Sequence, residues 1–254
     1  MTCPERRIEY LTSAEIAEAI AAGDRTAILP LAATEQHGPH LPLSMDSDHA
    51  DALAVRIAHR LATALVLPTV RVGYSPHHLG FPGTLSVRAS TLEAICLDHC
   101  ANLAAHGFTR VVLFSGHLGN YPVMRDFEPR LAAALAPALQ VIVYRNSAAV
   151  LDAWRESAES VAALGSRVRG HADVAETSVM LALHPERVRA GRAAAGYLGP
   201  VDEEFLRQAF IEGVDAVSVN GVLGDPIGAS DAIGHAALDA VTDLVVEYAT
   251  AHGA

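Results

Sequence analysis

Short apolar runs alternate with longer amphipathic segments through the first 145 residues of the chain. Each short run has the length of a buried strand, and the segments between the runs have the apolar spacing of helices. This alternation is typical of a parallel sheet with helices on both faces. The predicted strands are residues 26–32, 64–70, 110–115 and 139–144.

Residues that commonly cap helices precede the amphipathic segments. Ser13, Asp46 or Asp48, Ser90 and Asn120 are the predicted helix starts. After residue 144 the rhythm changes. Helices are expected at 148–164, 174–183 and 231–251, separated by an irregular stretch at 165–173 and by a turn-rich region that includes 220–230. Because no repeat, linker or low-complexity tract marks a boundary, we expect one domain over residues 1–254.

The charge balance excludes several classes of function. The chain carries 18 basic and 29 acidic residues, a net charge of -11, and every basic residue is arginine. Without lysine, neither Schiff-base chemistry nor a P-loop is available. An acidic chain without basic runs is not expected to bind nucleic acid or an anionic membrane. The 13 histidines indicate metal ligation or proton transfer, although a diffuse excess without function would look the same.

The cysteines and the amino-terminal segment indicate the cellular setting. Cys3, Cys96 and Cys100 show no CxxC spacing, and Cys96 and Cys100 would share one face of a helix, so they are interpreted as reduced core thiols. The first residues carry charges where a signal peptide needs an apolar stretch, and no apolar run has the length of a membrane span. We therefore expect a soluble, cytoplasmic protein.

The polar segment directly after the first predicted strand, residues 35–48, is the most informative. Glu35 and His37 lie two apart, so in an extended chain both side chains point the same way and can hold one cation or one ligand each of two cations. The prolines that follow stiffen the loop that leads to Asp46 and Asp48. The alternative is that these groups are solvated loop side chains, with Asp46 or Asp48 as a helix N-cap.

Two further segments add histidines and carboxylates. His117 lies between Gly116 and Gly119 at the carboxyl end of a predicted strand, the edge where open parallel sheets form their sites. His171 precedes a helix start, and Glu176 follows in its first turns. Asp173 and Glu176 could equally be an N-cap and its capping-box partner. Asn120 could hold the loop or cap the next helix.

Together these side chains form an oxygen and nitrogen ligand set without thiolate. Such a set suits Zn²⁺, Mn²⁺ or Fe²⁺, and a carboxylate can bridge two such ions. The sequence contains no GxSxG elbow, no GxGxxG after a strand and no HExxH helix. A metal-activated water is thus the nucleophile that the ligand set favours.

Five motifs in this order and spacing resemble the creatininase (creatinine amidohydrolase) family: TEQHGPHLPLSMDSD, FPGTLSV, SGHLGN, HADVAETS and NGVLGDP. The resemblance spans roughly residues 25–230. It implies a three-layer α/β/α fold with a central, mostly parallel sheet. It also implies a homo-oligomer, commonly a hexamer, and a dinuclear metal site that hydrolyses non-peptide amide bonds through a metal-bridged hydroxide.

The resemblance also assigns roles residue by residue. Glu35 and His37 match ligands of different metals, Asp46 the bridging carboxylate, and His117 a ligand of the metal that Glu35 holds. His171 stands at the position of the family's catalytic histidine, here a general acid. The implied cofactors are a pair of divalent ions, with Zn favoured over Mn or Fe. In the segment YSPHHLGFPGTLS, Ser75, His77 and His78 are predicted to contact substrate.

Three departures from the family pattern bear on function. Creatininases carry a glutamate two residues after the histidine of the third strand loop, where this chain has Gly119, and we predict that Glu176 supplies the missing ligand. Asp173 replaces a usual glycine, and Trp154 is the only tryptophan available for an aromatic lid.

The predicted activity is hydrolysis of an amide, lactam or formamide of a small molecule. The alternatives are a peptidase of the mycofactocin type and a non-catalytic member with a degraded site.

Overall fold

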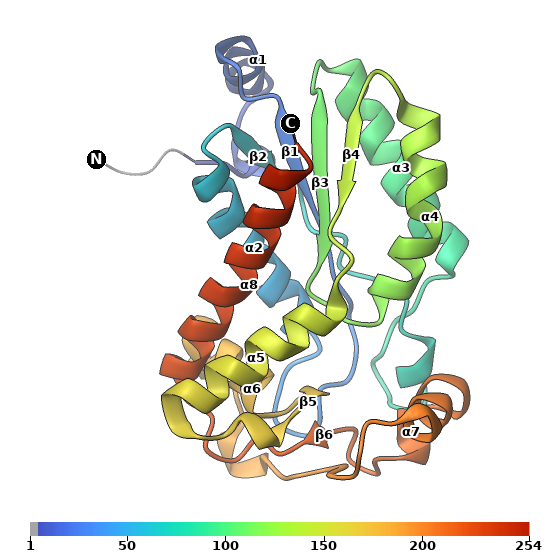
Figure 1. Ribbon diagram of the computed structural model, residues 1–254, viewed down its shortest axis with the longest axis vertical. Coiled ribbons are helices and arrows are strands. Elements are labelled where there is room, and N and C mark those ends of the chain that lie inside the picture. Colours follow the sequence, from blue (N-terminus) through green and yellow to red (C-terminus); the bar gives the residue numbers. More distant parts are fainter. Residues whose placement is uncertain (1–4, 254) are drawn as a thin grey trace.

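The computed structural model describes residues 5–253, and its centre is a parallel sheet. The strands are β1 (Thr26–Leu31), β2 (Ala64–Val66), β3 (Arg110–Ser115) and β4 (Gln140–Val143), in the order β2-β1-β3-β4 (Figure 1). β1 pairs with β3 from Thr26↔Arg110 to Leu31↔Ser115, so the two strands end at the same level. The loops that leave β1 and β3 therefore start side by side.

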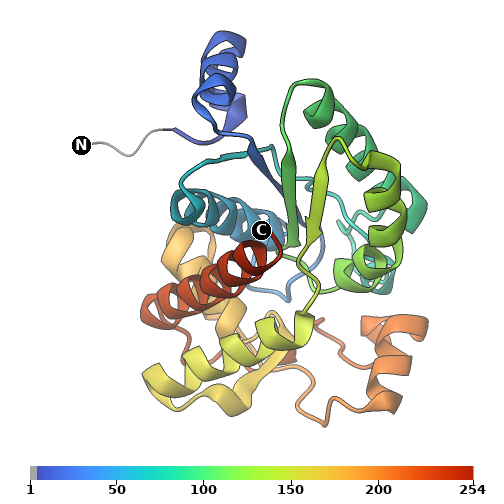
Figure 2. The same cartoon turned by 45° about the horizontal axis from the view of Figure 1, so that its top comes forward.

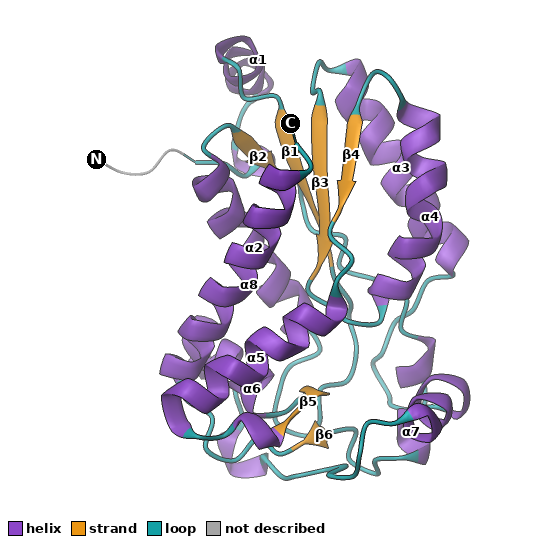
Figure 3. Cartoon of the chain, viewed as in Figure 1, coloured by secondary structure: helices purple, strands orange, loops and turns teal. Residues whose placement is uncertain are grey.

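Helices cover both faces of the sheet, which confirms the three-layer α/β/α arrangement (Figures 1 and 3). On one face α3 (Ala89–Ala105) and α4 (Asn120–Leu135) pack with alternate strand residues such as Leu29 and Leu113. α1 (Ser13–Ala22) adds partly buried side chains to this layer. Cys96 and Cys100 are buried there as free thiols, as predicted, and burial raises the pKa of Cys100 to about 12. Cys3 lies outside the described residues.

The opposite face is covered by α2 (Met45–Leu61), α5 (Ser147–Ala162), α6 (Val174–Leu183) and α8 (Asp231–Ala251). The strand residues in between, such as Ile28 and Val112, point into this layer. Figure 2 shows α8 running across α2 and α5. No helix among residues 5–253 combines the length and the apolar character that a membrane span requires.

The lower half of the molecule in Figure 1 lies beyond the carboxyl ends of the central strands. It contains the antiparallel pair β5 (Val168–His171) and β6 (Leu223–Gly224), and α7 (Glu203–Arg207), which continues into a π-helix at Gln208–Glu212. These elements, called the arch below, lie over the carboxyl-terminal edge of the sheet, next to the loops that carry the predicted site residues.

The strands of the central sheet were predicted correctly, but β2 is shorter than expected and ends before Pro68. Two predictions were wrong. The stretch 165–173 is not irregular throughout, since it contains β5. Its strand pattern is hidden because Gly170 has φ +98° and interrupts the alternation.

The predicted helix caps were the second error. Neither Asp46 nor Asp48 is an N-cap, because α2 begins at Met45 after Ser44. The N-caps of α1, α3 and α4 are Thr12, Arg88 and Gly119, each one or two residues before the predicted Ser13, Ser90 and Asn120.

Candidate metal and catalytic site

Glu35, Asp46 and His117 form the first half of a buried polar cluster. Glu35 lies in the loop after β1, His117 in the loop after β3 and Asp46 in the first turn of α2. Nδ1 of His117 lies 3.2 Å from Oε1 of Glu35 and 3.3 Å from Oδ2 of Asp46. These contacts follow from the level ends of β1 and β3, which bring both loops to the amino-terminal end of α2.

His37 and Glu176 form the second half, on the other side of Asp46. Nε2 of His37 lies 3.3 Å from Oδ1 of Asp46 and 3.6 Å from Oε2 of Glu176. Asp46 thus turns one oxygen toward His117 and the other toward His37. All five side chains are at most 4% exposed, so the charges of the cluster face each other and not solvent.

His171 and His78 complete the cluster. Nδ1 of His171 lies 3.8 Å from Oε1 of Glu35 and 4.0 Å from Oε2 of Glu176, between the two halves. Nε2 of His78 lies 3.3 Å from Oε1 of Glu35. The rings of His37 and His171 are 4.3 Å apart, and those of His78 and His171 are 4.4 Å apart.

Backbone carbonyls determine which nitrogen of each ring faces the cluster. Nδ1 of His37 donates to the carbonyl of Glu35 at 3.1 Å and Nε2 of His117 to that of Tyr74 at 3.2 Å. Nε2 of His171 lies 2.8 Å from the backbone carbonyl of Gln36 and 2.9 Å from its carboxamide nitrogen. Since a carbonyl only accepts, a hydrogen is on the nitrogen that donates to it, and the other nitrogen of the ring faces the carboxylates. A histidine held this way by an outer carbonyl has the arrangement typical of metal ligands.

His78 has the opposite arrangement. The Gln36 carboxamide oxygen accepts from the backbone of Gly38 at 2.9 Å, so its nitrogen is the atom that lies 2.9 Å from Nδ1 of His78. Nδ1 of His78 accepts, and Nε2 carries the hydrogen toward Glu35. Nε2 of His78 therefore faces Oε1 of Glu35, without a hydrogen bond between them. Sequence reasoning missed Gln36, whose position between two site residues was the available signal.

Several polar atoms of the cluster lack a hydrogen-bond partner within residues 5–253, namely both carboxylate oxygens of Glu35, Oδ2 of Asp46 and Nε2 of His37. Buried polar atoms are normally satisfied, and a convergent group of unsatisfied acceptors is a site for a missing positive ligand. Three overlapping sets have ligand atoms within 4.8 Å of one another: Glu35–Asp46–His117, His37–His171–Glu176 and Glu35–His78–His171. The residues present therefore fit divalent cations.

The titration behaviour of the cluster agrees with this excess of negative charge. Burial opposes the charged form of His37, but Asp46 and Glu176 outweigh it and raise the pKa of His37 to about 10. Burial raises the pKa of Glu176 to about 8. The His37–Glu176 half of the cluster thus favours bound protons, whereas burial lowers the pKa of His78 and of His171.

Gly119 is explained by the space around it. A Cβ added there would lie 2.3 Å from Nε2 of His117 and 2.8 Å from Cε1 of His77. No side chain fits without displacing these rings. Glu176 reaches the cluster from α6 instead, while its neighbour Asp173 caps that helix by accepting from the backbone of Ala175 and Glu176. The capping role predicted for Asp173 is confirmed.

A cavity of ≈ 150 Å³ opens beside the cluster between the central sheet edge and the arch of α7. His77, His78, His117, His171 and Glu176 line it on the cluster side. Its other walls are largely apolar and come from Leu118, Leu151, Val201, Phe205, Leu206, Ala209, Phe210, Val214 and Leu223. Ser75 is fully buried behind it, with its hydroxyl 3.3 Å from Nε2 of His117.

The apolar arch of this cavity was not foreseen, because α7 has only five residues and shows no readable period. Asn120, in contrast, lies where it was expected to hold the loop. Its amide donates to the carbonyl of Ala32 at 3.0 Å and its oxygen accepts from the backbone of Tyr74 at 2.9 Å. It thus joins the loops on which Glu35 and Ser75 lie.

Known proteins share both the sequence pattern and the fold. The family model described as creatinine amidohydrolase matches residues 9–249. The mycofactocin precursor peptide peptidase of Mycolicibacterium smegmatis is 34% identical over 212 residues, which cover 82% of this chain and 77% of that protein. The creatinine amidohydrolase of Pseudomonas putida is 33% identical over 197 residues, which cover 72% of this chain and 73% of that protein.

Solved structures agree over nearly the whole chain. A crystal structure of creatinine amidohydrolase superposes with a TM-score of 0.81 at 29% identity, covering 98% of both chains. A variant creatininase described as Zn-Zn type has a TM-score of 0.80 at 28% identity, and one described as creatininase Mn has 0.79 at 27%, each with 98% of both chains covered.

Proposed function

The chain belongs to the creatininase family, and from this premise we propose that it is a metal-dependent amidohydrolase that cleaves a non-peptide C–N bond of a small molecule. One observation supports this most strongly. His37 and His117 each donate one ring hydrogen to a backbone carbonyl and turn the other nitrogen toward a cluster in which both oxygens of Glu35 and Oδ2 of Asp46 have no hydrogen-bond partner within residues 5–253. Purely structural histidines would satisfy both nitrogens or face apolar neighbours.

In this proposal Glu35 and His117 hold one divalent cation, and His37 and Glu176 hold another. Asp46 is placed to serve both, because its two oxygens face different histidines. Zn²⁺ fits this donor set, as do Mn²⁺ and Fe²⁺, and solved creatininases described as Zn-Zn and Mn support the first two. When bound, such cations lower the pKa of water and polarise an amide carbonyl.

His171 is the proposed general acid. Its Nδ1 lies between the two halves of the cluster and borders the cavity, so a proton held there can pass to the nitrogen that leaves an amide. The contact between its Nε2 and the carbonyl of Gln36 keeps the ring in this orientation. His77 and His78 line the cavity and are proposed to contact substrate, whereas Ser75 would act through His117.

The second candidate is a peptidase. It is favoured by the 34% identity to a mycofactocin precursor peptide peptidase. The site chemistry would be the same, and only the leaving group would differ.

A substrate panel separates these readings. Protein loaded with Zn²⁺ or Mn²⁺ is offered lactams, formamides, cyclic ureides and short peptides, with and without a chelator. We expect hydrolysis of a small amide that the chelator abolishes and that added metal restores. Preference for the peptides would favour the second candidate. Hydrolysis that survives chelation, or none at all by metal-loaded protein, would contradict the proposal.

A further inference from the structure

We propose that Arg169 recognises a carboxylate on the substrate, so that the preferred substrates are small amides carrying an acid group near the scissile bond, such as N-acyl amino acids. This inference rests on the proposed amidohydrolase function and adds the substrate class. Arg169 lies on β5, two residues before His171, and lines the same cavity. It is the only cationic side chain besides histidine among the described residues that line it.

The hydrogen bonds of Arg169 leave part of its guanidinium group free. Nη1 donates to the carbonyls of Ser166 at 2.8 Å and Val168 at 3.1 Å, and Nε donates to that of Gly199 at 3.4 Å. Guanidinium has five N–H donors, and within residues 5–253 the Nη2 pair has no acceptor. Three neutral carbonyls orient the group without neutralising it.

Among residues 5–253 this guanidinium group forms no ion pair within 4.0 Å, whereas the nearby Arg155 and Arg167 pair with Asp152 and Asp225. Glu156 and Glu159 border an outer hollow that Arg169 shares, but neither forms an ion pair with it. Arg169 is a partly buried residue beside apolar walls, and a guanidinium group without a counter-charge can bind an anion through paired, charge-assisted hydrogen bonds.

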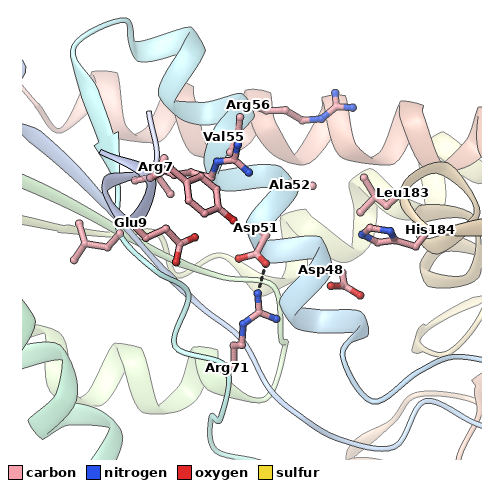
Figure 4. Close-up of a pocket in the computed structure, with 13 residues that line it drawn as sticks. Arg7, Glu9, Asp48, Asp51, Ala52, Val55, Arg56, Arg71, Leu183 and His184 are labelled. Atoms are coloured by element: carbon pink, nitrogen blue, oxygen red, sulfur yellow. Dashed lines mark hydrogen bonds and ion pairs between the residues drawn. The ribbon is translucent and has the colours of Figure 1, made fainter. Parts of the chain in front are cut away.

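The larger cavity on the outside of the molecule provides the contrast (Figure 4). It has a volume of ≈ 400 Å³ and is lined by Arg7, Arg56 and Arg71. Each of these already pairs with a carboxylate, Arg7 with Glu5, Arg56 with Asp239 and Arg71 with Asp51. The arginine in the cavity beside the histidine cluster is unpaired, and those in the outer cavity are not.

The small volume limits what this carboxylate can be attached to. At ≈ 150 Å³, the cavity holds an acyl group and an amino acid of modest size. With the amide at the cluster and the acid at Arg169, the apolar residues of the arch contact the part in between. The proposal therefore predicts discrimination between a free acid and its neutral amide.

Binding of N-acetylglycine and of N-acetylglycinamide, measured by calorimetry, tests this recognition. We expect the wild type to bind the acid roughly 10-fold to 100-fold more tightly than the amide, as a charge-assisted pair contributes. Arg169→Met should remove this preference by weakening acid binding and leaving amide binding unchanged. Arg155→Met, which removes a cation at the outer hollow without touching the cavity, should keep it. In turnover the Arg169→Met effect should appear in KM and not in kcat.

Equal affinity of the wild type for acid and amide would overturn the proposal, and so would a preference that Arg169→Met retains. If Arg169→Met does not fold, Arg169→Gln removes the charge and keeps an N–H donor near the position of Nε, and the wild-type comparison needs no variant. Binding is measured with and without metal. Failure of metal-dependent hydrolysis would therefore count against the proposed function, whereas loss of the acid preference counts against Arg169 alone.

Discussion

Helix α2 carries carboxylates on two sides, and their partners differ. Asp46 faces the sheet edge, where its ion-pair partners among residues 5–253 are His37 and His117. Asp48 and Asp51 line the outer cavity, where Arg71 lies 2.5 Å from Asp51 (Figure 4). Arg187 lies 2.9 Å from Asp48. An arginine is always charged and completes an ion pair, while a histidine can present a lone pair instead. The arginine pairs neutralise Asp48 and Asp51 on the outer side of α2, whereas the histidines leave negative charge at Asp46 for a cation.

The largest effect is expected from Asp46→Asn, because this change weakens the carboxylate shared by both halves of the cluster. Loss of even an outer partner of a metal ligand costs about 10-fold to 100-fold in metal affinity or activity, so loss of the shared ligand should exceed this range. Metal content by mass spectrometry and hydrolysis should fall together. A variant that keeps its full metal content would show that Asp46 is not a ligand.

His171→Ala should separate catalysis from metal binding. General acid catalysis contributes typically about 10²-fold to 10⁴-fold, so turnover should drop by that factor while bound metal stays unchanged. Single-turnover kinetics and metal analysis of the same preparation check both parts. Because Nδ1 of His171 also lies within reach of Glu176, loss of metal in this variant would reassign His171 as a ligand.

A smaller effect concerns stability against pH. In the metal-free protein the folded pKa values of His37, about 10, and Glu176, about 8, lie above their usual values of 6.5 and 4.5. The protonated forms stabilise the fold, so the free energy of unfolding should fall as pH rises from about 6 to 10. Metal binding reverses the trend, because protons compete with cations for the same atoms. Urea unfolding at several pH values, with and without metal, measures both slopes, and equal slopes would contradict this account.

Asp51→Asn is the matched control, with the smallest effect. The side chains of Asp51 and Arg71 are 41% and 54% exposed, and exposed ion pairs contribute only about 0–1 kcal/mol. Thermal unfolding should change little and metal content not at all. If Asp51→Asn lost metal as Asp46→Asn is expected to, the distinction between the two sides of α2 would be wrong.

Much of the fold and the cluster could be predicted because both depend on local order. The apolar runs predicted the central strands, and residues just beyond β1 and β3 had to meet at one edge. The arch over the cavity could not be predicted, since α7 and β6 are too short for a period and are held by contacts distant in sequence. The role proposed for Arg169 could not be predicted either, because it depends on the lack of a carboxylate near its guanidinium group, which only the folded structure shows. The substrate and the oligomeric state stay predictions.

The most direct measurement is the number of divalent ions bound per chain, determined by native mass spectrometry after reconstitution with Zn²⁺ or Mn²⁺. We expect about two ions per chain in the wild type and in Asp51→Asn, as in a two-metal site, and fewer in Asp46→Asn. A wild-type protein that binds no ion, or an Asp46→Asn variant that binds as many as the wild type, would contradict it.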